Sequence, residues 1–248
     1  MSNKLAIYKV IDGAEDYYIK KERIADVPFR SLIIGRSYFS GKSNLLCNLL
    51  CRDEFYGRDF SGKNIFIVSP SIDNDEKLQK LIKVKEIPDV NLMREYNEEI
   101  LTELYGMLEE EYEEAVEEGK KPEQKIIIFD DISYSGAFKS KNKGGILSKI
   151  FSNGRHILLS TIVTSQKYSD ISTSARENAS FVMVFNSSNK QLELIEADHN
   201  VLTDGKKAFM AMFRKSLEKP HSFFVINYSN KLEDRYMDSE FNSLKVID

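Results

Sequence analysis

Three residues in the first third of the sequence have the types and spacing of a phosphate-binding loop. Gly41, Lys42 and Ser43 separate an apolar run at 31–34 from a leucine-rich run at 45–50. In such a strand-to-helix turn, backbone N–H groups and the helix N-terminus hold a β-phosphate, while the lysine extends to the β- and γ-oxygens. The hydroxyl of Ser43 then ligates Mg²⁺. The spacing therefore predicts a bound nucleoside triphosphate.

The loop departs by one position from the usual pattern, GxxxxGK[ST]. The matching window begins at Arg36, and Gly35 lies one residue too early. Either the loop is one residue longer and Gly35 makes its turn, or Arg36 tolerates a backbone conformation that normally favours glycine. The predicted cradle consists of Gly35, Arg36, Ser40, Gly41, Lys42, Ser43 and Asn44.

Two adjacent carboxylates follow the most apolar strand that the sequence predicts. Residues 126–129 read IIIF and lead directly into Asp130 and Asp131. Paired negative charges at the end of a buried strand are costly unless a cation lies nearby. The pattern matches the Walker B form, in which the first carboxylate lies near Mg²⁺ and the second orients and deprotonates the attacking water. We expect Asp130 to share a metal site with Ser43 and Asp131 to act as the catalytic base.

A polar residue also ends the next predicted strand along the chain. Gln166 follows the apolar run at 157–163. A glutamine at this place can hydrogen-bond both the γ-phosphate and the attacking water, so it senses which nucleotide is bound. Alone it would carry no meaning, but with the loop and the acid pair it completes a predicted hydrolytic site.

Several strands must end at one edge of a sheet if these residues are to act together. Apolar runs predict strands at 31–34, 64–70, 126–132, 157–163 and 179–186. Helical spacing predicts helices directly after the loop and at 72–84, 96–119 and 145–151. This alternation predicts a mostly parallel α/β sheet with its ligand site at the carboxyl ends of the strands. The segments 207–215 and 221–229 predict a C-terminal β-hairpin.

Composition bounds the class of protein. A chain of 248 residues with 42% hydrophobic content can bury a full core, and it has no apolar run of membrane-spanning length. The first residues lack the pattern of a secretory signal, so we expect a protein that is not secreted. The net charge of -4 argues against a uniformly basic surface but leaves room for a local lysine patch. We expect an N-terminal arm at 1–26 and a single domain at 27–248.

Four segments, in order, carry a family resemblance. Pro28-Phe29-Arg30 leads into the phosphate loop, IFIVSPS follows the first helix, and IIIFDDI carries the acid pair. The longest segment, 151–185, has a Gly-Arg-His sequence, a strand ending in glutamine, and an arginine and an asparagine before another strand. Over residues 27–190 the chain resembles the poxvirus-type genome-packaging ATPases, within the FtsK–HerA superfamily of DNA-pumping motors.

The resemblance implies a P-loop NTPase fold of the RecA/FtsK–HerA type, with a mostly parallel central sheet flanked by helices. It implies a homo-oligomeric ring of five or six subunits that hydrolyses ATP with Mg²⁺ and pushes double-stranded DNA into a capsid. A capsid vertex or portal component would then be a partner, in the host cytoplasm, viral factory or virion. Hydrolysis at a subunit interface needs a cation from the neighbour, worth roughly 10³ to 10⁵ in rate. Arg155 and Arg176 are the candidates, with a slight preference for Arg155 because it directly precedes a buried strand.

Lysines follow the acid pair in a polar loop. Lys139, Lys141, Lys143 and Lys149 occur among glycines and serines in the segment 133–149. A packaging motor must hold DNA through its phosphates, because it cannot depend on base sequence. A loop directly after the catalytic aspartates can move with the nucleotide state. We predict that these lysines contact DNA, and a merely solvated loop is the alternative interpretation.

Other functions stay open at this point. A related cellular or plasmid DNA translocase or helicase would favour an additional DNA-processing domain, for which this chain has little room. A nucleotide-binding assembly protein with weak or no turnover is suggested by the bulky loop, where Arg36 and Phe39 stand at usual glycine positions. A P-loop kinase for a small molecule would carry an arginine-rich lid, which the sequence does not show.

Overall fold

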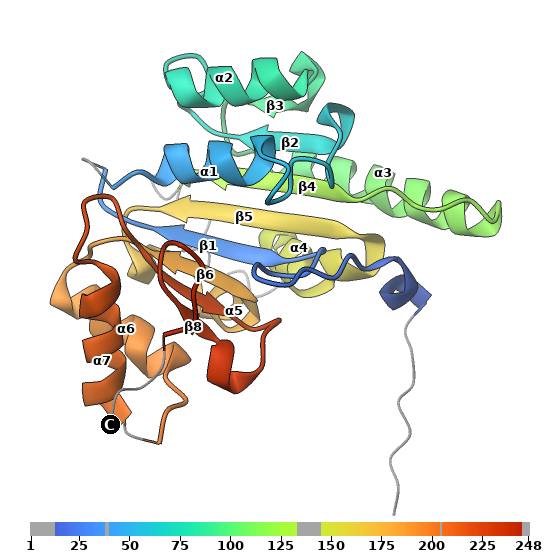
Figure 1. Ribbon diagram of the computed structural model, residues 1–248. Helices are drawn as coiled ribbons and strands as arrows, with labels where there is room; N and C mark the ends of the chain where they lie inside the picture. Colours follow the sequence, from blue (N-terminus) through green and yellow to red (C-terminus); the bar gives the residue numbers. More distant parts are fainter. Residues whose placement is uncertain (1–12, 38–39, 133–144, 204, 245–248) are drawn as a thin grey trace, which may run out of the picture.

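The order of strands in the sheet brings the predicted site residues to neighbouring positions. The computed structural model describes residues 13–37, 40–132, 145–203 and 205–244, which contain one eight-stranded sheet in the order β3-β2-β4-β5-β1-β6-β7-β8 (Figure 1). The first six strands of this order run parallel, and β7 and β8 are added antiparallel. The predicted fold class is confirmed. The strands are β1 (Arg30–Ile34), β2 (Ile65–Val68), β3 (Leu92–Met93), β4 (Lys125–Asp130), β5 (Leu159–Ser165), β6 (Phe181–Val184), β7 (Phe224–Asn227) and β8 (Tyr236–Met237).

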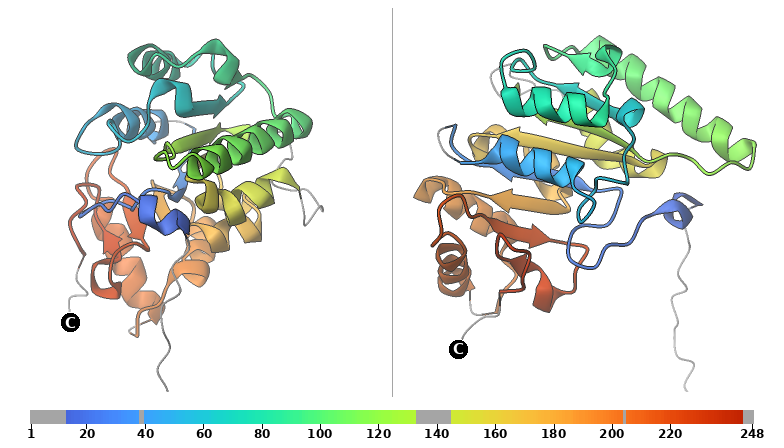
Figure 2. Two further views of the ribbon diagram at one scale, coloured as in Figure 1. Left: turned by 90° about the vertical axis from the view of Figure 1, so that its right-hand side faces the viewer. Right: turned by 45° about the horizontal axis from the view of Figure 1, so that its top comes forward.

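Helices cover both faces of the sheet (Figures 1 and 2). Because successive side chains of a strand point to opposite faces, β1 contributes Leu32 and Ile34 to one core and Ile33 to the other. The Ile33 core is closed by α1 (Lys42–Cys51) and α2 (Glu76–Lys85). The other core is closed by α3 (Glu98–Glu117), α4 (Ile146–Asn153), α5 (Thr173–Asn178), α6 (Asn189–His199) and α7 (Gly205–Ser216). None of the helices in the described ranges is long and apolar enough to cross a bilayer.

The strand register aligns the carboxyl ends of β1, β5, β4 and β2 at one edge. Ile34 lies opposite Ser165, and Asp130 lies opposite Thr164. Val68 lies opposite Phe129, so the residue after each of them also falls at this edge. The phosphate loop, the acid pair and Gln166 therefore leave the sheet from adjacent strands, as the alternation of strands and helices predicts.

The C-terminal hairpin is placed differently from the prediction. Residues 207–215 lie in α7 and not in a strand. Phe209, Met212 and Phe213 are spaced so that one face of a helix buries all three, and Phe209 and Phe213 pack edge-on against Phe224 of β7. The antiparallel partner of β7 is the short strand β8 instead, because the apolar content of 207–215 has helical and not alternating periodicity.

The described part of the N-terminal segment lies against the sheet domain. A 3-10 turn, η1 (Gly13–Tyr17), is followed by a single antiparallel bridge between Ile19 and Val27. The carbonyl of Tyr17 accepts a hydrogen bond from the Gln124 side chain at 2.8 Å. Ile24 and Ala25 are buried in the same core as α1. Residues 13–26 thus contact the domain through both backbone and apolar side chains.

A buried histidine joins α6 to the C-terminal strands. His199 is 2% exposed and lies between two phenols, with Nε2 2.8 Å from Tyr168 Oη and Nδ1 2.9 Å from Tyr228 Oη. Burial lowers the pKa of His199 to about 4, while Asp198 opposes this change and Arg176 assists it. The imidazole is therefore neutral in the folded chain at neutral pH.

Acidification is expected to destabilise the fold through His199. The unfolded imidazole titrates near pH 6.5, whereas the folded one resists protonation down to about 4, so the unfolded state takes up the proton first. The stability from this group is present above pH 6.5 and is lost as the pH falls toward 4, by up to about 1.4 kcal/mol per pH unit. Urea unfolding at several pH values should show that the free energy of unfolding falls less steeply with acidification in His199→Gln than in wild type. At pH 7 the variant should be less stable than wild type. Equal slopes for the two proteins would contradict the assignment.

Candidate active site

The turn after β1 depends on Gly35. Its N–H donates to the carbonyl of Ser165 at 3.0 Å, which extends the pairing of β1 with β5. A Cβ on Gly35 would lie 2.9 Å from the Cβ atoms of both Phe185 and Ser40, too close for any side chain. Arg36 is exposed and is not among the described residues with positive φ. The longer loop, with Gly35 at its turn, stays a prediction, which the lack of room for a side chain at Gly35 supports.

Gly41 and Lys42 form the start of α1. Gly41 has a φ of 94°, a left-handed conformation that glycine adopts at little cost. It caps α1 without a side-chain hydrogen bond, which leaves the first N–H groups of the helix to an incoming anion. The Lys42 ammonium donates to the carbonyl of Gly35 at 2.8 Å and to that of Arg36 at 3.4 Å. Lys42 thus spans the loop that is predicted to receive the phosphates.

Lys42 also faces the acid pair. Burial lowers the pKa of its ammonium group, whereas Asp131 and Asp130 act in the opposite direction. Asp130 itself is 6% exposed at the end of β4. Burial raises the pKa of the Asp130 carboxyl, hydrogen bonds from Thr164 and Ser69 oppose the change, and two neighbouring aspartates add to it. A carboxylate that burial disfavours in this way is stabilised by a nearby cation.

Two hydroxyl groups orient Asp130. Thr164 Oγ1, at the end of β5, donates to Asp130 Oδ1 at 2.6 Å. Ser69 Oγ, just after β2, donates to Asp130 Oδ2 at 3.0 Å. Both carboxylate oxygens are therefore held by neighbouring strands, and the side chain has one defined orientation at the sheet edge.

Asp131 and Gln166 lie in contact at the ends of β4 and β5. The Gln166 amide donates to Asp131 Oδ2 at 2.8 Å, and the Asp131 N–H donates to Thr164 Oγ1 at 3.1 Å. Asp131 has a φ of 49°, a left-handed conformation that costs energy for a residue with a side chain and is typical of functional sites. The structure thus brings the predicted base and the predicted sensor together.

An unpredicted carboxylate holds Ser43. The Ser43 hydroxyl donates to Asp75 Oδ2 at 3.0 Å. Asp75 immediately precedes α2, and a short loop connects it to the end of β2. Because Ser69 at the start of this loop bonds Asp130, the segment 69–75 contacts both residues that were predicted to bind the metal.

The oxygen atoms at this edge suit Mg²⁺. Ser43, Asp130 and Asp131 supply a hydroxyl and two carboxylates, which are the hard ligands that Mg²⁺ prefers. Within the described ranges, no three His, Cys, Asp or Glu side chains form a group that could hold a metal. A hydroxyl and two carboxylates fit an ion that is bound by one or two side chains together with substrate phosphates.

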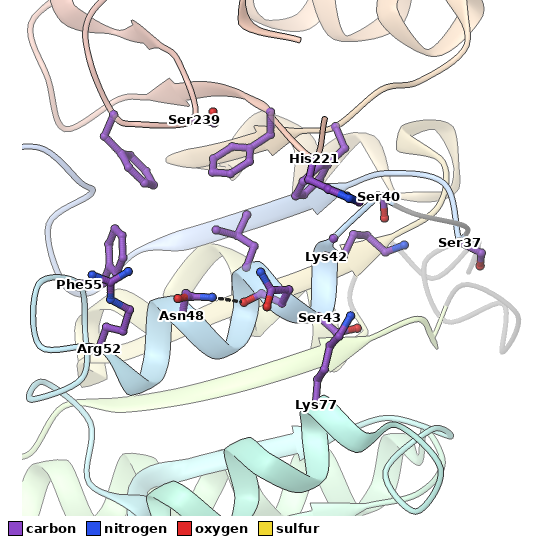
Figure 3. Close-up of a pocket in the computed structure, with 16 residues that line it drawn as sticks. Ser37, Ser40, Lys42, Ser43, Asn48, Arg52, Phe55, Lys77, His221 and Ser239 are labelled. Carbon is purple, nitrogen blue, oxygen red and sulfur yellow. Dashed lines mark hydrogen bonds between the residues drawn. The ribbon is translucent and has the colours of Figure 1, made fainter. Parts of the chain in front are cut away.

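A cavity of about 520 Å³ extends from the phosphate loop along α1 (Figure 3). Lys42 and Ser43 lie at one end, and Arg52 and Phe55 lie at the other. The wall opposite α1 comes from β6 and the C-terminal region and is largely aromatic. Its rings are those of Phe185, Phe223 and Phe241, with centroids 5.1 Å apart for the first two and 6.0 Å apart for the last two.

Sequence reasoning missed residues of two kinds. Ser69, Asp75 and Thr164 are short polar residues at or just after predicted strands, so a survey of every strand end would have found them as candidates. The aromatic wall had no local signal. Phe223 and Phe241 come from a region where no motif exists. The pairing of β7 with β6 brings Phe223 beside Phe185, and Phe241 packs against Phe223 and Phe55.

Residues 17–239 match the sequence model of the family described as Poxvirus A32 protein. The chain belongs to the Poxvirus A32 protein family. The resemblance to poxvirus-type packaging ATPases is therefore confirmed for this A32-family chain. A search of curated proteins gave no significant match.

Solved structures share the fold of this A32-family chain at low sequence identity. B204, the DNA-packaging ATPase of Sulfolobus Turreted Icosahedral Virus, has 19% identity and a TM-score of 0.57, over 82% of this chain and 93% of that chain. The genome-packaging NTPase B204 of Sulfolobus turreted icosahedral virus 2 with AMPPCP has 16% identity and a TM-score of 0.55, over 81% and 92%. EssC (ATPases 2 and 3) from Geobacillus thermodenitrificans has 16% identity and a TM-score of 0.53, over 80% of this chain and 37% of that chain.

The two candidate arginines of this A32-family chain lie in different surroundings. Arg155 is exposed and lies in η6 (Gly154–Ile157), which precedes the amino end of β5. Gln166 follows the carboxyl end of β5, so the two residues lie at opposite ends of this strand. Arg176 is 9% exposed, with Nη1 3.1 Å from Asp198 Oδ2 and its guanidinium 5.0 Å from the centre of the Tyr168 ring. Arg176 is thus engaged inside its own chain, whereas the Arg155 side chain is exposed.

Three of the four lysines predicted to bind DNA, Lys139, Lys141 and Lys143, lie outside the described residues. Lys149, on α4, is 2.8 Å from Glu109 Oε2 and 4.2 Å from the centre of the Tyr105 ring, both on α3. It therefore links two helices of its own chain. Contact of these lysines with DNA stays a prediction.

Proposed function

We propose that this chain is an ATP-driven motor that moves double-stranded DNA into a viral capsid and works as a homo-oligomeric ring. The observation that carries the proposal is the convergence of Lys42, Asp130, Asp131 and Gln166 at one sheet edge in a member of the A32 family. Similarity in fold to two B204 enzymes described as packaging ATPases or NTPases supports it. The proposed setting is the viral factory or the virion.

The proposed reaction is attack of water on the γ-phosphorus of ATP. Asp131 accepts the water proton, and Gln166, already bonded to Asp131, orients the water. Lys42 exchanges its bonds to the loop carbonyls for bonds to the β- and γ-oxygens, and ADP leaves as the β–γ bond breaks. A Mg²⁺ held by Ser43 and Asp130 would neutralise charge on the phosphates.

The nucleoside half of ATP is proposed to occupy the aromatic end of the cavity. α1 has ten residues and is therefore about 15 Å long. Phosphates at its first turn would leave the base beside Asn48, Arg52 and Phe55 (Figure 3). The Phe241 ring lies 5.5 Å from that of Phe55. Aromatic rings and a guanidinium plane stack well on a nucleobase. This placement assigns the polar end of the cavity to the triphosphate and the apolar end to the base.

The ring and its partners extend the proposal. A closed ring of five or six copies would place Arg155 of one subunit near the site of the next, where a cation stabilises the transferring phosphoryl group. The lysines of 139–149 are proposed to contact DNA phosphates, and a capsid vertex or portal component is the proposed docking partner.

The deciding experiment is phosphate release by the purified chain with and without double-stranded DNA. We expect hydrolysis that DNA stimulates and that EDTA abolishes, with single-stranded DNA as the control. Light scattering with a non-hydrolysable analogue and DNA should show closed rings in the same samples. A chain that binds the analogue but releases no phosphate with DNA would instead be an assembly protein without turnover.

A further inference from the structure

We propose that Asp75 is a positioning residue that aims the hydroxyl of Ser43 at the Mg²⁺ accompanying ATP. The inference rests on the proposed ATP site and adds a residue that the phosphate loop, the acid pair and Gln166 do not include. Asp75 is half-buried and is the N-cap residue of α2, and its two carboxylate oxygens make different contacts.

The two oxygens of Asp75 have different partners. Oδ1 accepts hydrogen bonds from the backbone N–H groups of Lys77 at 2.8 Å and Leu78 at 3.2 Å, which caps α2. Oδ2 accepts a hydrogen bond from the Ser43 hydroxyl at 3.0 Å. One side chain therefore connects the first turn of α1 to the first turn of α2.

Capping alone does not account for the charge at this position. Asn97 caps α3 in the same way, with its Oδ1 accepting from Glu99 N–H at 2.9 Å and Ile100 N–H at 3.1 Å. A neutral amide is thus sufficient for a cap in this chain, and asparagine and aspartate cap equally well in general. What Asp75 has in addition is a second, negatively charged oxygen, and that oxygen is bonded to Ser43.

The hydrogen bond sets which atoms of Ser43 face the phosphate site. A hydroxyl has one proton and two lone pairs, so fixing the proton on Asp75 leaves the lone pairs for a cation. Residues that hydrogen-bond a metal ligand, and so orient it without touching the metal, usually contribute a factor of about 10 to 100 in metal affinity or activity. The negative charge also favours a cation nearby and disfavours a triphosphate that arrives without one.

The test compares Asp75→Asn with wild type for binding of a non-hydrolysable ATP analogue, once in Mg²⁺ and once in EDTA. The variant keeps an oxygen to cap α2 but presents an amide instead of a carboxylate to Ser43. We expect the Mg²⁺-dependent gain in affinity to fall by about tenfold, while affinity in EDTA stays equal or improves. Titration of Mg²⁺ at saturating analogue should give a correspondingly weaker apparent affinity for the metal.

Variants at two helix caps separate positioning from stability. Asp75→Ala and Asn97→Ala each remove a cap and should lower stability by similar amounts, about 1 kcal/mol. Only the Asp75 variants should change the Mg²⁺ dependence. If Asp75→Asn retains the wild-type Mg²⁺ dependence, Asp75 is a cap only and the inference is wrong, although the nucleotide site stands. A wild-type chain that binds no analogue in either buffer would reject the proposed function and the role of Asp75 together.

Discussion

ATP hydrolysis by Asp131→Asn is expected to fall by roughly 10² to 10⁴, with nucleotide binding retained. The amide cannot accept the water proton, but it keeps an oxygen that can bond the Gln166 amide. The fold should tolerate the change, because asparagine, like aspartate, adopts left-handed backbone conformations more readily than most residues. Loss of turnover would then report lost chemistry and not a lost site.

Single-turnover phosphate release at saturating ATP measures this effect, and equilibrium binding of a non-hydrolysable analogue checks the site. Asp89→Asn is a matched control, because that carboxylate is 83% exposed and lies beside β3 at the edge of the sheet. It should hydrolyse ATP at the wild-type rate. Wild-type turnover by Asp131→Asn would instead assign the base to a different group.

Arg155→Ala is expected to lower hydrolysis in the assembled ring by roughly 10³ to 10⁵, the usual contribution of an arginine supplied to a transferring phosphoryl group. The residue cannot serve its own site. β5 separates it from Gln166, and seven residues of strand span roughly 20 Å. Because Arg155 is exposed, its removal should leave thermal stability near that of wild type.

Mixing two inactive variants tests whether Arg155 acts on a neighbouring subunit. Rings that combine Arg155→Ala subunits with Asp131→Asn subunits contain interfaces where an intact Asp131 meets an intact Arg155. Partial recovery of hydrolysis on mixing is the expected result. Mixed rings that form but stay inactive would contradict action between subunits.

Arg176 supplies the comparison for this experiment. Arg176→Ala leaves Asp198 without its cation in a largely buried network, so we expect the melting temperature to fall, because an uncompensated buried charge is costly. A lower rate for this variant should follow its loss of folded protein. If Arg155→Ala partly restores hydrolysis with an Asp131→Asn partner and Arg176→Ala does not, the failure of Arg176→Ala reflects its loss of folded protein and not a role in the reaction.

The strands β1, β2, β4, β5 and β6 and the helices α1 to α4 followed from the sequence because they depend on local patterns, whereas β3, α5 and α6 were not predicted. Apolar runs such as IIIF predict buried parallel strands, and the residues that end parallel strands must meet at one edge. The approach of Lys42, Asp130, Asp131 and Gln166 was therefore predictable without knowledge of any contact. The error at 207–215 was one of pattern, because Phe209, Met212 and Phe213 recur at helical and not at alternating spacing.

Tertiary structure decided everything that depends on distances between segments remote in the chain. Glycine is required at position 35 because Phe185, 150 residues further on, leaves no room for a Cβ there. Asp75 reaches Ser43 only because α1 and α2 lie on the same face of the sheet, and Arg176 is buried only because α6 brings Asp198 beside it. The sequence by itself determined which residues end the strands, since hydrophobic period and motif are local properties. Which side chains are in contact, and which are buried, depends on how whole helices and strands pack. A short segment of sequence does not contain that information.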